Sequence, residues 1–61
     1  MMINLSAEVK VIKEDEVFIT DAYRVAPYNN RIYFYMNGVI VSSYNLNDIE
    51  LIAEDGMIII R

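Results

Sequence analysis

The stretch Ile32-Tyr33-Phe34-Tyr35-Met36-Asn37-Gly38-Val39-Ile40-Val41-Ser42-Ser43-Tyr44 decides the fold class. Two runs of β-branched and aromatic residues flank an Asn-Gly pair, and this pair supplies the positive φ angles of a type I′ turn. The stretch therefore predicts a tight β-hairpin. A two-residue loop places Phe34 beside Val41 and Ile32 beside Ser43 on one face of that hairpin. The same register gathers four residues on the other face, namely Arg31, Tyr33, Tyr35 and Tyr44.

The N-terminal part predicts a second hairpin. Strict alternation over residues 3–11 indicates a half-buried strand with one apolar face, formed by Ile3, Leu5, Ala7, Val9 and Val11. A charged turn at Glu14-Asp15 follows, and a strand resumes at Val17 and continues irregularly to Val25. The hairpin pairs Lys13 with Glu16 and Val11 with Phe18. The same register sets Glu8 opposite Asp21, so we expect a bulge or the end of pairing near Asp21.

The C-terminal part predicts a polar bend and a third hairpin. Asn and Asp side chains can bond their own backbone, so Asn45–Asp48 indicates a bend or a single 3₁₀ turn near residues 46–49. Strands over Ile49–Glu54 and Met57–Arg61 then flank a two-residue loop at Asp55-Gly56. In this register Leu51, Ala53, Ile58 and Ile60 face the core, and Ile52, Met57 and Ile59 face outward.

Short turns between successive strands predict an all-β fold for one domain over residues 1–61. We expect a small antiparallel meander of five or six strands, arranged as an SH3-like barrel or a curled sheet. The only proline, Pro27, lies in a polar and aromatic break that predicts the mid-chain loop. No long window carries the apolar spacing of an α-helix.

The composition argues against catalysis. The chain has no cysteine and no histidine, which removes thiol nucleophiles, zinc–thiolate sites and the usual acid–base catalyst at neutral pH. Both glycines, Gly38 and Gly56, belong to predicted turns, so no phosphate-binding loop remains. The acidic residues lack the spacing of a divalent-metal loop. We expect no enzyme activity, no cofactor and no metal.

The charge balance bears on partners and location. Nine acidic and five basic residues give a net charge of −4, which disfavours non-specific binding to nucleic acid or to an anionic membrane. The first residues lack the features of a secretory signal, and no stretch approaches the roughly 20 apolar residues of a membrane span. We expect a cytoplasmic protein with no membrane partner.

Two surfaces are candidates for protein contacts. Tyr and Arg often anchor protein interfaces, so we expect a partner-binding face formed by Arg31, Tyr33, Tyr35 and Tyr44. The alternative is structural: these rings close a barrel or pack against the loop around Tyr23 and Tyr28.

The second surface concerns self-association. Hydrophobic residues make up 56% of the chain, more than so small an interior can easily bury. The uncharged strand Met57–Ile60 is either central in its sheet or an edge that pairs with another copy. We expect a homodimer or higher oligomer with an interface formed by Ile52, Met57, Ile58, Ile59 and Ile60.

The composition is rich in Ile, Asn, Tyr, Glu and Lys and poor in Gly, Pro and Ala. It resembles that of small phage or mobile-element proteins from AT-rich genomes, although no motif carries this resemblance. The resemblance implies a larger host protein as the partner, and a role in inhibiting or modulating a host defence complex in the host cytoplasm. We therefore expect a non-catalytic protein-binding module. The alternatives are a small-ligand or nucleotide-binding sponge formed at an oligomer interface and a nucleic-acid-binding regulatory β dimer.

Overall fold

The computed structural model describes residues 8–61, so residues 3–7 of the predicted first strand lie outside the described part. Residues 8–61 form seven strands and two 3₁₀ turns. In chain order the elements are β1 (Val9–Lys13), β2 (Glu16–Thr20), β3 (Ala22–Ala26), η1 (Pro27–Asn29), β4 (Arg31–Met36), β5 (Val39–Asn45), η2 (Leu46–Asp48), β6 (Ile49–Ile52) and β7 (Met57–Ile60).

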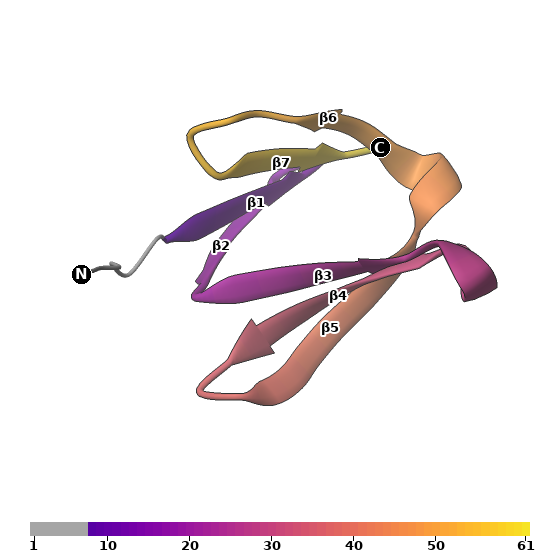
Figure 1. Cartoon of the computed structure of the whole chain (residues 1–61). Coiled ribbons are helices and arrows are strands. Elements are labelled where there is room, and N and C mark those ends of the chain that lie inside the picture. Colours follow the sequence, from indigo (N-terminus) through magenta and orange to yellow (C-terminus); the bar gives the residue numbers. More distant parts are fainter. Residues whose placement is uncertain (1–7) are drawn as a thin grey trace.

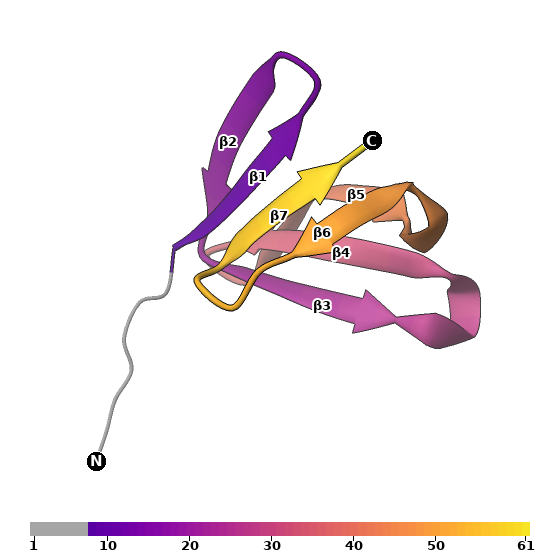
Figure 2. The ribbon, with the colours of Figure 1, turned by 90° about the horizontal axis from the view of Figure 1, so that it is seen from above.

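The strands form two facing sheets (Figure 1). Sheet A has the order β2-β1-β7-β6, and sheet B has the order β3-β4-β5. Asp21 joins β2 to β3 at one end of the molecule, and η2 joins β5 to β6 at the other (Figure 2). The predicted small, mostly antiparallel β meander is confirmed. The structure has seven strands, one more than the five or six predicted, because the predicted irregular strand from Val17 to Val25 divides at Asp21.

The division at Asp21 turns the chain from one sheet into the other. The Asp21 N–H donates to the Tyr35 carbonyl oxygen at 3.1 Å. Its carboxylate oxygen Oδ2 accepts from the Asn37 N–H at 2.9 Å. The corner is therefore tied to the β4–β5 hairpin, and the predicted end of pairing at Asp21 is confirmed.

Strand β7 lies between β1 and β6, so it is not a free edge. It pairs parallel to β1, with Val11 opposite Ile58. This position leaves the side chains of Ile58 and Ile60 only 0% and 2% exposed. The predicted core-facing orientation of these two isoleucines is therefore confirmed, and their place at or beside a dimer interface stays a prediction.

The core lies between the sheets. Its buried members come from β1, β4 and β7 and are Val9, Val11, Ile32, Phe34, Ile58 and Ile60. The Phe34 ring is central, with the Phe18 ring 6.1 Å away and the Tyr44 ring 6.0 Å away, both edge-on. Burying each large apolar side chain stabilises the fold by about 1.5–3 kcal/mol relative to exposure.

The central hairpin has the predicted turn but not the predicted register. Asn37 and Gly38 have φ angles of 55° and 80°, as a type I′ turn requires. The register then shifts between Phe34 and Tyr35, so Phe34 pairs with Ser42. The extra residue in β5 is a bulge, which moves every later side chain of that strand to the opposite face. Tyr44 consequently points to the core, and its predicted place beside Tyr33 and Tyr35 is wrong.

The β6–β7 hairpin also differs by one residue. The Ala53 N–H donates to the Met57 carbonyl at 2.8 Å, and the Gly56 N–H donates to the Ala53 carbonyl at 3.1 Å. The loop therefore has three residues rather than two. Leu51 now pairs with Ile59, so its side chain lies on the outer face of sheet A and not, as predicted, in the core. Ile52 pairs with Ile58 and shares its face, although it remains exposed at the strand end.

The two polar breaks were predicted correctly. Pro27–Asn29 forms η1 between β3 and β4, and Leu46–Asp48 forms η2 between β5 and β6. The Asn45 side-chain oxygen accepts from the Asn47 N–H at 2.8 Å, which is the local side-chain bond expected of an Asn at this bend.

The two glycines provide a matched test of the fold. Both have positive φ, so alanine at either position is strained, by about 1–3 kcal/mol. A Cβ at Gly38 meets nothing within 4 Å, whereas a Cβ at Gly56 lies 2.7 Å from the Glu8 carbonyl oxygen. Gly56→Ala should therefore lower the free energy of unfolding more than Gly38→Ala in urea titrations followed by circular dichroism. Equal losses would contradict the close approach of the β6–β7 loop to β1.

The Ser42 hydroxyl provides a second test. Its oxygen is buried and has no hydrogen-bond partner in residues 8–61. Because an unpartnered buried hydroxyl costs free energy, Ser42→Ala should leave stability unchanged or raise it by up to about 1 kcal/mol. Ser43→Ala is the control, since the Ser43 hydroxyl accepts from Arg31 at 2.7 Å and its loss should be destabilising. A clear loss of stability in Ser42→Ala, measured by thermal unfolding, would place this hydroxyl in a hydrogen bond.

Candidate functional site

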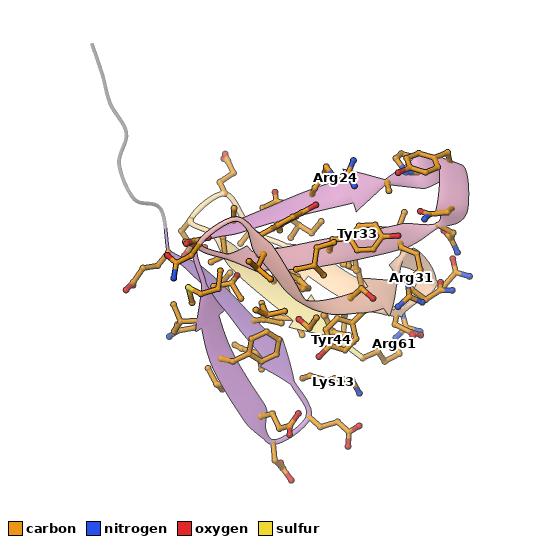
Figure 3. The ribbon with its side chains drawn as sticks, turned by 90° about the horizontal axis from the view of Figure 1, so that it is seen from below. Lys13, Arg24, Arg31, Tyr33, Tyr44 and Arg61 are labelled. Atoms are coloured by element: carbon orange, nitrogen blue, oxygen red, sulfur yellow. The ribbon has the colours of Figure 1, made fainter. Side chains whose placement is uncertain are left out.

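The outer face of sheet B gathers tyrosine and arginine side chains. Ile32 and Phe34 are buried, so alternation along β4 directs Arg31, Tyr33 and Tyr35 away from the core. Strand β3 sets Arg24 opposite Tyr33, and β5 sets Ser43 opposite Tyr33 on the other side. Figure 3 shows Arg24, Tyr33 and Arg31 across β3 and β4. We call this surface the tyrosine–arginine face, formed by Arg24, Arg31, Tyr33, Tyr35 and Ser43.

Three of the four predicted partner-binding residues meet on this face, and the fourth does not. Arg31, Tyr33 and Tyr35 are co-facial as expected. Tyr44 packs against Phe34 on the inner side of sheet B because of the bulge in β5. Arg24 takes part in the face but was not among the predicted site residues. Its position on the face depends on the register between β3 and β4. The alternation within β3 predicts which residues share a side of that strand, but it does not predict their partners in β4.

Hydrogen bonds hold the side chains of this face in place. Arg24 donates from Nε to the Tyr35 hydroxyl at 3.2 Å, and its guanidinium carbon lies 5.6 Å from the centre of the Tyr33 ring. Asn29 donates from Nδ2 to the Tyr33 hydroxyl at 2.7 Å, and Arg31 donates from Nη2 to the Ser43 hydroxyl at 2.7 Å. The side chains are thus oriented before any partner arrives.

Arg24 also interacts with a third tyrosine, Tyr28. The hydrogen bond to Tyr35 raises the pKa of the Arg24 guanidinium above its ordinary value, and the charge interactions with Tyr35 and Tyr28 raise it further. Tyr28 projects from η1 at the rim of the face and is 77% exposed. It is the most exposed large hydrophobic side chain in the described part of the chain.

Charge is distributed unequally between the sheets. Residues 22–45, which contain all of sheet B, carry two arginines and no acidic residue. All nine acidic residues lie in the remainder of the chain. Within residues 8–61 one salt bridge forms, between Lys13 and Glu14 on the β1–β2 turn at 3.5 Å. The tyrosine–arginine face is therefore locally basic on an acidic protein.

The outer face of sheet A is apolar. Cross-strand register aligns four side chains, one from each strand, in a row: Val17, Ile12, Ile59 and Leu51. In the adjacent row, Lys10 lies between Ile19 and Met57. None of the apolar members packs against the core cluster, and Val17 is 58% exposed. We call this surface, formed by Ile12, Val17, Ile19, Leu51, Met57 and Ile59, the apolar face.

The predicted dimer residues divide between this face and the interior. Met57 and Ile59 are half-buried members of the apolar face. Ile52 lies at the end of β6 on the side of the core, and Ile58 and Ile60 are buried within it. Ile12, Val17, Ile19 and Leu51 were missed: the first three join Met57 and Ile59 only through the position of β1 beside β7, and Leu51 joins them because of the extra residue in the β6–β7 loop.

Two further findings concern chemistry and membranes. Among the side chains of residues 8–61, no group of three or more His, Cys, Asp or Glu residues is placed to hold a metal ion. Over the same residues, no helix is long and apolar enough to cross a bilayer.

Comparisons with known proteins give no relative. No protein-family model, no curated protein and no solved structure matches the chain. Its function is therefore inferred from the tyrosine–arginine face and the apolar face alone.

Proposed function

We propose that the chain is a non-catalytic protein-binding module that holds its partner on the tyrosine–arginine face. The observation that supports this most is the network joining Arg24 to Tyr35 and Arg31 to Ser43 on a face turned away from the core. Tyrosine and arginine bury large areas at protein interfaces, and side chains already held in one conformation lose little entropy on binding.

The core does not require these tyrosines. Strand β4 supplies Ile32 and Phe34 to the interior from its other side, and both are fully buried. Tyr33 and Tyr35 remain partly open to solvent. Contact with a partner would remove the rest of these two rings from water, which is the arrangement common at the centres of protein interfaces.

The identity of the partner stays a prediction. The expectation of a host protein, inhibited or modulated by a phage or mobile-element product, depends on composition alone. The first alternative, a small-ligand or nucleotide-binding sponge, would need a pocket between subunits. The second, a nucleic-acid-binding regulatory dimer, would need a longer basic surface than two arginines supply.

Removing the two rings tests the proposal. The double change Tyr33→Ala with Tyr35→Ala should leave the β-sheet circular dichroism spectrum intact and abolish partner capture in pull-downs from the native host. Val39→Ala is the control, because Val39 is 63% exposed and lies outside the face. If the double variant is folded and captures the same partner, the face is not the binding site.

We further propose that two copies associate through the apolar face. Strands of a sheet with one solvated face usually alternate apolar and polar residues, yet the outer positions of sheet A, which contains one parallel pair, are mostly apolar. Leaving a large side chain in water forgoes ~1.5–3 kcal/mol relative to its burial. A two-fold pair would cover the same patch on both copies.

Charge substitutions on this face test the dimer. Multi-angle light scattering at micromolar concentration should give twice the chain mass for the native protein. Ile59→Lys and the more exposed Val17→Lys should each give monomers, because either places a charge within the contact. Val39→Lys, on sheet B, should remain dimeric. A native monomer, or dimers in both apolar-face variants, would reject this interface.

A further inference from the structure

The hydroxyl groups of the tyrosine–arginine face are arranged to donate. The Tyr35 hydroxyl oxygen accepts from Arg24, the Tyr33 hydroxyl oxygen accepts from Asn29, and Ser43 Oγ accepts from Arg31. Each hydroxyl also has one O–H to donate. Within residues 8–61, none of these three O–H groups donates to another protein group. The face therefore presents three oriented donors to an incoming ligand.

The two guanidinium groups add charged donors without local compensation. Each has five N–H groups and no acceptor, and the side-chain partners of Arg24 and Arg31 on this face are neutral hydroxyls. The salt bridge formed within the described part of the chain lies elsewhere, between Lys13 and Glu14. A complementary ligand is therefore anionic and rich in acceptors, which describes carboxylate and phosphate groups.

The spacing of the two arginines favours a particular ligand geometry. Arg24 is opposite Tyr33, and Arg31 is opposite Ala26, so the arginines are diagonal neighbours on one face. The backbones of diagonal positions lie about 7–8 Å apart across a sheet, while the Arg24 side chain reaches toward Tyr35 and the Arg31 side chain toward Ser43. In an extended peptide, residues two apart point to the same side and are separated by about 7 Å. Two acidic residues with one residue between them match this spacing.

We propose that the tyrosine–arginine face recognises an extended acidic segment of its partner, with two carboxylates in a Glu-x-Glu or Asp-x-Asp arrangement. This inference rests on the proposed protein-binding function and names the chemistry of the partner. Each carboxylate accepts from one guanidinium, and the hydroxyls of Tyr33, Tyr35 and Ser43 donate to the remaining carboxylate lone pairs.

A nucleic acid fits this face less well. Single-stranded nucleic acids carry a charge at every phosphate, and proteins that bind them present a basic groove along several nucleotides. Sheet B offers two cations, and every acidic residue of the chain lies outside it. The face therefore neutralises a short run of carboxylates better than a phosphate backbone.

Capped synthetic peptides test the ligand. The peptide STETETS should bind ¹⁵N-labelled protein saturably and shift the side-chain Nε–H signals of Arg24 and Arg31. The neutral peptide STQTQTS should bind at least about tenfold more weakly, because it lacks both charges. The peptide STETTES should also lose about tenfold in affinity, because its two carboxylates point to opposite sides of an extended chain.

Matched protein variants locate the site. Arg24→Gln and Arg31→Gln should each reduce the affinity for STETETS by about tenfold, through loss of charge-assisted hydrogen bonds. Lys13→Gln removes the same charge from the β1–β2 turn, outside both the tyrosine–arginine face and the apolar face, and should leave the affinity unchanged. Circular dichroism verifies that each variant is folded. Equal losses in all three variants would show a response to net charge and overturn the proposal.

The outcomes separate this inference from the proposed function. In one outcome, Tyr33→Ala with Tyr35→Ala abolishes partner capture, both Arg→Gln variants retain it, and STETETS does not bind. The proposed binding function then stands, and the acidic ligand is rejected. If an oligothymidylate binds more tightly than STETETS and depends on both arginines, the ligand is nucleic acid and the inference is overturned. If the tyrosine variant retains capture, the proposed function fails first.

Discussion

Parallel pairing of β1 with β7 is the constraint on which the remaining structure depends. It joins two hairpins from opposite ends of the described chain into sheet A, and it aligns Val11 with Ile58 above Phe34. Without it, the two hairpins would not form the continuous apolar surface that covers the inner face of sheet B. The pairing brings together residues separated by most of the sequence, so its closure costs more chain entropy than any of the four hairpins. The buried isoleucines of β7 offset that cost.

Because side chains alternate along each strand, each sheet has an inner and an outer side of different composition. The inner sides share one core, whereas the outer sides diverge: sheet A is apolar and sheet B carries oriented hydrogen-bond donors. Association through the apolar face would leave both tyrosine–arginine faces exposed on opposite sides of a dimer. Such a dimer would bind two copies of its proposed ligand, and a partner with two acidic segments would gain affinity by effective concentration.

Local rules made much of the fold predictable. The turns at Glu14-Asp15 and Asn37-Gly38, the break at Asp21 and the bend at Leu46–Asp48 each depend on a few adjacent residues. The errors came from single-residue shifts. Because β5 contains one bulge residue, Tyr44 faces the core rather than the predicted outer side. Because the β6–β7 loop has one extra residue, Leu51 faces the outer side of sheet A rather than the core. The parallel pairing joins strands that are distant in the sequence, and the place of Arg24 depends on the register between β3 and β4 across the η1 loop. The rules for two-residue hairpin loops predict neither.

The separation of charge between the sheets affects how an acidic partner approaches. At physiological ionic strength the Debye length is about 8 Å, shorter than the ~10 Å between facing sheets. A partner near sheet B then senses Arg24 and Arg31 more strongly than the acidic turns of sheet A at Glu14–Glu16 and Glu54-Asp55. At about 0.01 M salt the Debye length reaches about 30 Å, and the whole net charge of −4 repels the same partner. Association with an acidic segment should therefore be fastest at intermediate salt, since concentrated salt screens the arginines as well.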